Sequence, residues 1–293
     1  MTSVDWTLPD VGTLCGQLEA ACLLEAATPK AGNVHPGASF ADLDFSDFVA
    51  SARVVAPILA RAGEVGVGTT IRLAAEATQK QVGKNTNLGI LLLLAPLAAV
   101  PSSQDLTTGI KSVLDALTVE DSRDVFAAIR CLTPGGMGKV DEQDVFQEPT
   151  EPLVDIMQLA ADRDSIARQY VIGFHDVRSF GVDSLIRWKE SGADWRTAIV
   201  GSQLDWLAAH PDTLIARKVG VELAQQAAHH AKAVLASGWP HAEGSRLQFG
   251  AFDAWLRADG HKRNPGSTAD LIAASVFAVL RDRHWTADYL VIN

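Results

Sequence analysis

The sequence has few cysteines, and they are not arranged for metal binding. Cys15, Cys22 and Cys131 form no close Cys-x-x-Cys pair, which argues against a zinc site. An odd number of thiols without a pairing pattern is typical of a reducing compartment. The first ten residues, MTSVDWTLPD, also lack the basic and apolar regions of a signal peptide. We therefore expect a cytoplasmic protein with reduced thiols.

Positive charge is also in short supply, and so are long hydrophobic runs. The chain has 25 Lys and Arg against 35 Asp and Glu, a formal net charge of −10, which gives no electrostatic support for nucleic-acid binding. The longest apolar stretch, 88–100, is too short to span a bilayer and contains Pro96. We expect neither a nucleic-acid partner nor a membrane. An anionic substrate would need local cations or a metal ion.

The alternation typical of β-strands is scarce, whereas helical spacing of apolar residues is common. Residues 11–22 carry apolar side chains at helical intervals after Pro9. Similar patterns predict helices over residues 46–62, 67–80, 86–99, 106–117, 120–131, 152–177, 182–190, 194–208, 212–236, 246–258 and 268–281. With 293 residues and 47% hydrophobic composition, the chain can bury a large core. We predict a single all-α domain, residues 1–293, of ten or more helices.

Polar residues gather in a few short segments, the first at residues 28–45, TPKAGNVHPGASFADLDF. One interpretation is a helix–loop–helix connection with solvated charges and an aspartate near an N-cap. The other is a cation–carboxylate cluster at the end of the preceding helix. In that case Lys30 contacts phosphate, and Glu25, Asp42 and Asp44 hold a hydrated Mg²⁺. Asn33, in the turn after Gly32, would then face the substrate.

The second segment, GKNTNLG at residues 83–89, leads directly into a very apolar helix. The first amides of a buried helix need partners, and Asn85 or Thr86 would cap it. Lys84, Asn85, Thr86 and Asn87 together exceed what a cap requires. Polar donors around a buried helix N-terminus favour an anion site. The spacing is not that of a Walker A loop.

The third segment lies in the least regular part of the chain, 132–151. Its glycines and lysine at 134–144, PGGMGKVDEQD, suit either a phosphate-binding loop or an ordinary surface turn. We expect 132–151 to cross the surface as a functional loop and not to divide two domains. The chain contains no Gly-x-Ser-x-Gly or His-Glu-x-x-His motif, which argues against a serine hydrolase or zinc enzyme.

The fourth segment, residues 161–177, places Asp164, Arg168 and His175 near one stripe of the predicted helix. Asp164 and Arg168 would form an i,i+4 ion pair, which on a solvated face is structural. On a helix that is apolar on its other sides, a polar stripe more often marks a site.

The fifth segment begins at Arg263. Ser267 and Asp270 have the spacing of a capping box, so Asp270 is either a cap or a metal ligand. Asn264 is left without a capping role.

These segments, in this order, resemble the triphosphoribosyl-dephospho-CoA synthase family, also called ATP:dephospho-CoA triphosphoribosyl transferases. The similarity rests on EAATPKAGNV with Asp42 and Asp44, on KNTNLG before a buried helix, and on NPGSTADLIA near the C-terminus. It runs from about Glu19 to about Arg281. Better-known members have Gly-Ala-His before the Asp-x-Asp and Asn-Thr-His-Lys-Gly in the second motif. Here Ser39 and the run Asn87-Leu88 stand instead, which suggests a divergent branch.

The resemblance implies an all-α enzyme that joins the ribose of ATP to a ribose hydroxyl of dephospho-CoA or a related acceptor and releases adenine. It implies ATP as substrate, Mg²⁺ as cofactor, and an acyl carrier protein pathway as the wider partner. Its implied roles are catalysis by Glu25 and Asp164, and metal binding by Asp42, Asp44 and Asp270. The substrate-binding residues would be Lys30, Asn33, Lys84, Asn85, Thr86, Asn87, Arg168 and Asn264. Two alternatives remain open: another Mg²⁺-dependent nucleotide enzyme, such as a kinase or phosphotransferase, and a non-catalytic helical scaffold.

Overall fold

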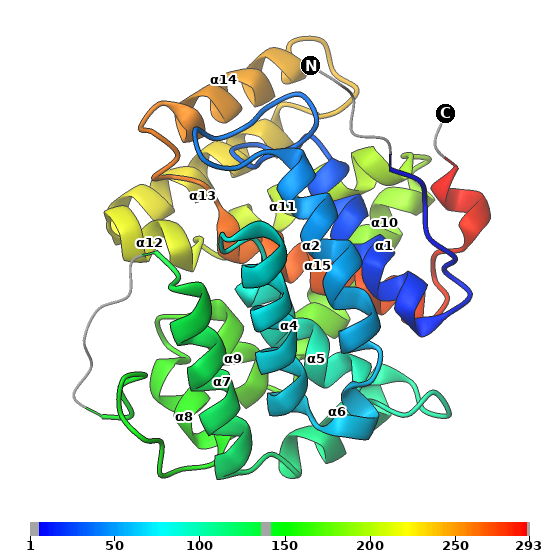
Figure 1. Cartoon of the computed structure of the whole chain (residues 1–293). Coiled ribbons are helices and arrows are strands. Elements are labelled where there is room, and N and C mark those ends of the chain that lie inside the picture. Colours follow the sequence, from blue (N-terminus) through cyan, green and yellow to red (C-terminus); the bar gives the residue numbers. More distant parts are fainter. Residues whose placement is uncertain (1–5, 136–141, 292–293) are drawn as a thin grey trace.

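The computed structural model describes residues 6–135 and 142–291, and within these ranges the fold is helical (Figure 1). The only β-type pairing in the described residues is one isolated bridge between His35 and Ala38. The α-helices are α1 (Leu14–Ala27), α2 (Phe45–Leu59), α3 (Ala62–Val65), α4 (Val67–Val82), α5 (Leu88–Ala98), α6 (Leu106–Asp115), α7 (Val119–Leu132), α8 (Leu153–Ala160), α9 (Ser165–Val171), α10 (Val182–Glu190), α11 (Trp195–Ala209), α12 (Thr213–Val219), α13 (Val221–Ala236), α14 (Ser245–Arg257) and α15 (Gly266–Arg281). A π-helical turn (Val177–Gly181) precedes α10, and a 3-10 turn (Ala287–Leu290) follows α15.

The all-α prediction is confirmed, but two of the predicted helices are each divided. The pattern over 152–177 forms α8 and α9, because Asp164 takes the N-cap position of α9 and accepts hydrogen bonds from its first amides. Beyond α9, Gly173 and Phe174 both have positive φ, which ends the helical path. The pattern over 212–236 is broken at Gly220, whose φ of 101° favours glycine. Apolar periodicity continues across these breaks, so the sequence pattern does not reveal them.

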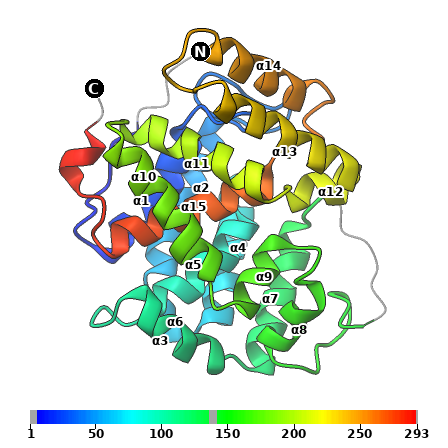
Figure 2. The same cartoon turned by 180° about the vertical axis from the view of Figure 1, so that it is seen from behind.

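Two helices, α5 and α15, form the centre of the molecule. Nearly all of α5 and α15 is buried. The α15 helix packs against α1, α5, α10, α11 and α12. It crosses behind α2 and α4 in Figure 1 and lies in front of them in Figure 2, which is the view from behind. Around it the main hydrophobic core includes α1, α2, α4, α5 and α7. A buried helix needs apolar side chains all round, which the runs LGILLLLAPLA and LIAASVFAVL provide.

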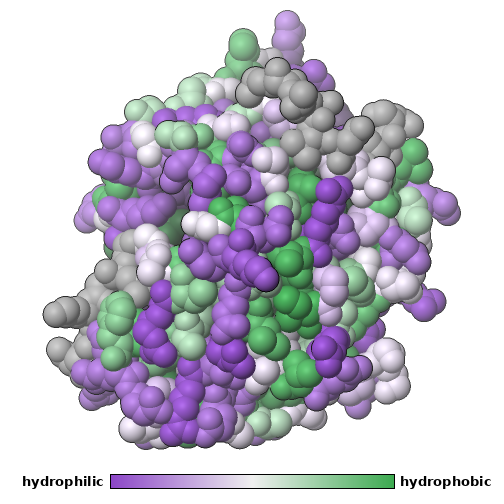
Figure 3. All heavy atoms as spheres, in the orientation of Figure 1, coloured by the Kyte–Doolittle hydropathy of each residue, from purple (hydrophilic) through white to green (hydrophobic). Residues whose placement is uncertain are grey.

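A second, smaller core lies at the end of the molecule formed by α12, α13 and α14. Ala227, Val234, Phe252 and Leu256 pack there against Leu204 of α11. The face in Figure 3 is mostly hydrophilic, with a strip of apolar side chains down its centre. Within the two described ranges, no helix is both long and apolar enough to cross a membrane.

Candidate functional site

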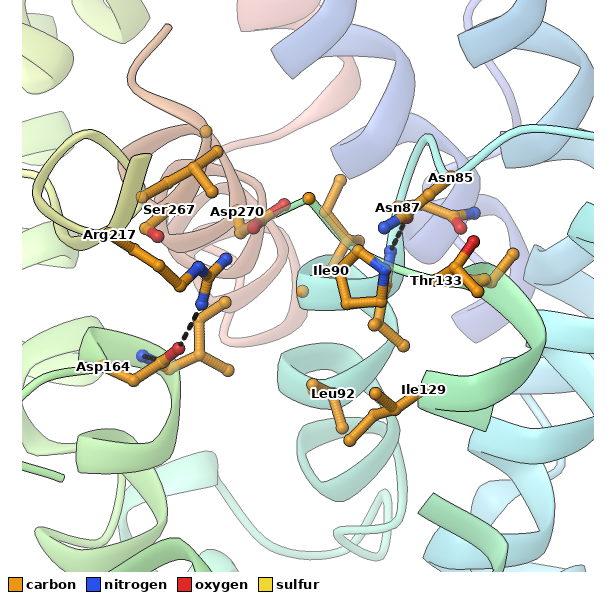
Figure 4. A pocket seen from close by; sticks show the side chains of 18 of the residues that line it. Asn85, Asn87, Ile90, Leu92, Ile129, Thr133, Asp164, Arg217, Ser267 and Asp270 are labelled. Carbon is orange, nitrogen blue, oxygen red and sulfur yellow. Dashed lines mark hydrogen bonds and ion pairs between the residues drawn. The ribbon is translucent and has the colours of Figure 1, made fainter. Parts of the chain in front are cut away.

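One cavity of about 1250 Å³ opens between the ends of several helices. The end of α1, the start of α5 and the start of α15 meet at its floor, while α7, α8, α9 and α12 form its walls (Figure 4). Single-ligand pockets are typically about 300–1,000 Å³, so this cavity is large enough for more than one small ligand. Segments that are far apart in the sequence therefore share one concave surface.

Most of the predicted site residues line this cavity. They are Glu25, Asn33, Asp42, Lys84, Asn85, Thr86, Asn87, Asp164, Asn264 and Asp270. Lys30, Asp44 and Arg168 are not part of its lining. The described flanks of the 132–151 loop, including Thr133 and Gln143, also line the cavity, whereas residues 136–141 of the predicted glycine-rich loop lie outside the described residues.

Glu25 and Lys30 form a buried ion pair at the floor. Lys30 Nζ lies 2.8 Å from Glu25 Oε1, and the exposed fractions of the two side chains are 0% and 5%. Lys30 Nζ also donates to the backbone carbonyl of Glu25. Burial lowers the pKa of Lys30, and the neighbouring Glu25 opposes this shift. We expected Lys30 to contact phosphate from the mouth of a loop, but its ammonium group turns back onto helix α1.

The loop after α1 is held by side chains from distant helices. The side-chain amide of Gln203, on α11, accepts from Ala31 N at 2.8 Å and donates to Ala31 O at 2.8 Å. It also donates to Asn33 Oδ1 at 3.0 Å. Gly32 N donates to Asp253 Oδ1 at 2.7 Å. Gly32 has a φ of 75°, as its expected turn requires. This loop is therefore ordered structure in the floor of the site.

Asp270 lies one turn into α15 with its carboxylate against the start of α5. A Cβ atom added to Gly89 would lie 2.1 Å from Asp270 Oδ2, so the carboxylate and the Gly89 backbone are in direct contact. Burial raises the pKa of Asp270 well above its usual value, and the charges of Glu25, Asp212 and Asp164 add to the rise. The Asp270 carboxylate accepts no hydrogen bond from the described residues, and Asp270 lines the cavity.

The capping box expected at Ser267 and Asp270 does not form. Pro265 occupies the N-cap position of α15 and makes no side-chain cap. Asp212 caps the helix from outside: its Oδ2 accepts from Thr268 N and Thr268 Oγ1, both at 2.8 Å. Its Oδ1 accepts from Ile215 N in α12 at 2.9 Å. Asp270 is consequently free of a capping role.

Polar side chains surround the start of α5 as the sequence predicts. Asn85 Oδ1 accepts from Leu88 N at 3.1 Å, while Asn87 exchanges hydrogen bonds with Thr78 at 3.1 and 3.2 Å. Thr86 is 8% exposed, and its buried Oγ1 has no hydrogen-bond partner among the described residues. A helix N-terminus with an unused hydroxyl beside it can accept an anion.

Two cations on α12 line the cavity, and the sequence analysis missed them. Arg217 Nη1 lies 3.1 Å from Asp164 Oδ2 (Figure 4). Lys218 Nζ donates to Asn264 Oδ1 at 2.9 Å, and burial lowers the pKa of Lys218. In the sequence, the adjacent Arg and Lys before Gly220 are typical of a helix C-terminus, which gives no indication of a site.

The expected pairing of Asp164 with Arg168 is wrong. Asp164 caps α9 and pairs with Arg217, whereas Arg168 Nε lies 3.2 Å from Asp176 Oδ2. Because the helix begins only at Ser165, Asp164 and Arg168 do not lie on one helical stripe.

The mouth of the cavity carries exposed charges. Asp42 is exposed and lines the cavity. Asp44 caps α2 in a capping box with Asp47, which is the structural role considered for it, and its bond from the Ser46 hydroxyl lowers its pKa. Lys84 Nζ lies 2.9 Å from Asp47 Oδ2. The Asp44 side chain therefore caps the first amides of α2.

The described residues contain no group of three or more His, Cys, Asp and Glu side chains that could hold a metal ion. Asp42, Asp44 and Asp270 therefore do not form one all-protein centre. Mg²⁺, however, commonly takes one or two carboxylates and completes its shell with substrate phosphates and water. Asp270 lines the cavity near other carboxylates and accepts no hydrogen bond from the described residues, so it fits that smaller protein contribution.

Comparison with known proteins gives a consistent result. The family model described as ATP:dephospho-CoA triphosphoribosyl transferase matches residues 13–288. A crystal structure of a protein from Archaeoglobus fulgidus, assigned as a triphosphoribosyl-dephospho-CoA synthase, is similar to this chain with a TM-score of 0.61 and 25% sequence identity. The match covers 80% of this chain and 98% of that chain. No curated protein matches.

Proposed function

The chain belongs to the ATP:dephospho-CoA triphosphoribosyl transferase family, and we propose that it transfers the triphosphoribosyl group of ATP to dephospho-CoA inside the cavity between α5, α12 and α15. The observation that carries this proposal is the meeting of Glu25, Thr86, Arg217 and Asp270 around one space of about 1250 Å³. The reaction has two nucleotide substrates, and this volume exceeds what one small ligand needs.

The triphosphate lies along the start of α5 and the end of α12. Arg217 and Lys218 supply positive charge there, although each already has a partner, Asp164 and Asn264. The first amides of α5 supply hydrogen bonds, and so does the buried Thr86 hydroxyl, which has no partner within residues 6–135 and 142–291. Asp164 and Asn264 then position the two cations. Asn33, Asn85 and Asn87 shape the same region but already make hydrogen bonds within the protein.

Glu25 acts as the base. The 2′-hydroxyl oxygen of the acceptor forms a bond to C1′ of the ATP ribose while the bond from C1′ to adenine N9 breaks. The hydroxyl proton goes to Glu25, and the bond electrons leave with adenine, which takes up a proton from water. Positive charge develops at C1′ in such a displacement, and nearby carboxylates stabilise it. Lys30 is a positioning residue, because its Nζ holds Glu25 Oε1 at 2.8 Å and balances its charge at this depth.

Asp270 would hold Mg²⁺ together with the phosphates of ATP, and Asp42 lies nearer the mouth of the same cavity. The ion supplies charge neutralisation for the triphosphate. We do not assign Asp44 or Arg168 to the site, because their side chains are used in a helix cap and an ion pair outside its lining. Lys84, paired with Asp47 at the mouth, supplies long-range attraction for anionic substrates.

The experiment incubates purified protein with ATP, Mg²⁺ and dephospho-CoA and measures adenine by chromatography and the coupled product by mass spectrometry. We expect adenine and product in equal amounts. Release of ADP without adenine would overturn the proposal and indicate phosphoryl transfer. Glu25→Gln should lower kcat by about 10²-fold or more while ATP binding persists. Glu19→Gln is the matched control, because Glu19 lies on the same helix but is partly exposed and lies 3.9 Å from Arg53.

The wider setting follows from the product. We infer that it is a prosthetic-group precursor for an acyl carrier protein, which is the role that the family resemblance implies for the product. We also propose a cytoplasmic location, and it is supported by the three cysteines, all of which are free thiols. Trapping of the product on a carrier protein in cell extract would test the first inference.

A further inference from the structure

Part of the cavity wall is apolar and lies apart from the charged floor. From α7, Val125, Phe126, Ile129 and Leu132 line it with the spacing of one helix face. From α8, Leu153, Ile156, Met157, Leu159 and Ala160 do the same. In Figure 4, Leu92 and Ile129 are drawn below Ile90, whereas Asp164 and Arg217 lie at the left of the view. We call the space between α7, α8 and Leu92 the apolar branch.

Some side chains of the apolar branch, including Val125 and Leu132, are buried in the main core, whereas others line the cavity with part of their surface exposed. Ile129 and Ile156 remain partly exposed, and Leu159 is 45% exposed at the mouth. Phe126 is buried, yet it belongs to neither hydrophobic core cluster. No residue of α7 or α8 that lines the cavity carries a charge. An apolar surface of this kind, connected to a polar site, is typical of a pocket for a ligand of mixed character.

The two substrates differ in the charge and polarity of the group that could enter this apolar branch. ATP ends in a triphosphate, which would lose its hydration against apolar walls without gaining a cation. Dephospho-CoA is ADP joined to a pantetheine arm, which is long, uncharged and carries methyl groups, two amides and a thiol. The lining stripe of α7 from Val125 to Leu132 covers about 10 Å of helix axis, so it suits an extended chain more than a compact group.

Building on the proposed function, we propose that the apolar branch binds the pantetheine arm of dephospho-CoA. The acceptor then enters with its arm between α7 and α8 and its ribose towards Glu25, while the triphosphate of ATP occupies the charged side. The branch thereby decides which nucleotide becomes the acceptor. Binding of the arm in this branch also explains why the cavity is larger than ATP alone requires.

The test compares dephospho-CoA with ADP, which is the same molecule without the arm, by titration calorimetry. In the unmodified protein dephospho-CoA should bind at least tenfold more tightly than ADP. In Ile129→Gln and Ile156→Gln, dephospho-CoA affinity should fall to within about threefold of that of ADP, and ADP affinity should stay unchanged. In turnover assays the same variants should raise the KM for dephospho-CoA and leave kcat and the KM for ATP unaltered. Leu247→Gln is the control, because Leu247 is 81% exposed on α14.

Equal affinity for ADP and dephospho-CoA in the unmodified protein would overturn the assignment, and so would unchanged affinities in both variants. Thermal unfolding of each variant identifies a loss that comes from misfolding, and retained ADP binding provides a second check. The outcome is separable from that of the proposed function. Arm-dependent binding without adenine release would leave the branch assignment standing and reject the reaction, whereas adenine release with equal use of ADP would do the reverse.

Discussion

Two ion pairs of the cavity, one at its floor and one at its mouth, join the same kinds of group in different surroundings. Lys30 and Glu25 are 2.8 Å apart with side-chain exposures of 0% and 5%. Lys84 and Asp47 are 2.9 Å apart with exposures of 43% and 17%. The two N–O distances are almost equal, so the two ion pairs differ mainly in how deeply they are buried. At the floor the groups have lost their water and depend on each other, whereas at the mouth water and salt screen the attraction.

The largest expected effect tests this contrast at the floor. Lys30→Met should lower the free energy of unfolding by about 3–5 kcal/mol, because it leaves the Glu25 carboxylate buried without its partner. Urea denaturation followed by circular dichroism measures the change. Glu25→Leu combined with Lys30→Met should recover much of the loss, since no charge is then left buried. A loss below about 1 kcal/mol for Lys30→Met would mean that water reaches this pair in solution.

A second expected effect concerns function more than folding. Gly89→Ala places a Cβ at 2.1 Å from Asp270 Oδ2 and 2.6 Å from Ile166 Cδ1, so the carboxylate must move. We expect kcat/KM to fall at least tenfold, about 1.4 kcal/mol in the transition state. Gly250→Ala is the matched control, because a Cβ there meets nothing within 4 Å and alanine favours a helix. Unchanged turnover in Gly89→Ala would remove Asp270 from the reaction.

The smallest effect is expected at the mouth. Lys84→Ala should change the free energy of unfolding by less than about 1 kcal/mol, as is usual for exposed ion pairs. The KM for ATP should rise only a few-fold, and less at high salt, because the contribution acts through screened charge. Steady-state kinetics at two ionic strengths measure this. A loss as large as that of Lys30→Met would erase the distinction between floor and mouth.

The sequence predicted the helical fold, and most of the site residues that it predicted line the cavity, because those signals are local. The apolar run from Leu88 identified a buried helix. The polar residues before it are more than one helix cap requires, which predicted that some of them line a site. Lys30 was harder to interpret. Its position in a loop predicted a solvated cation, but Glu25 lies five residues earlier on the last turn of α1, and the chain folds back to pair them. Such a reversal depends on the packing around the loop.

The missed features all depend on contacts between distant segments. Asp212 caps α15 across 56 residues, so the apparent capping box in the sequence had no predictive value for Asp270. Arg217 and Lys218 lie at an ordinary helix end, and only the packing of α12 against α15 brings them to the cavity. Asp164 looked like an i,i+4 partner of Arg168 because periodicity cannot distinguish one long helix from two short ones.

The hydrogen bonds of Gln203 to Ala31 and Asn33 also have a consequence for protein synthesis. The Gln203 amide donates to and accepts from the loop backbone, as a neighbouring peptide group would in regular secondary structure. It belongs to a residue that is translated about 170 positions later. Asp253 and Asp270 arrive later still. Contacts with such sequence separation form slowly. During synthesis, the loop after α1 therefore lacks its hydrogen-bond partners until Gln203 and Asp253 have been added. The cavity forms only after Asp270 has been added as well.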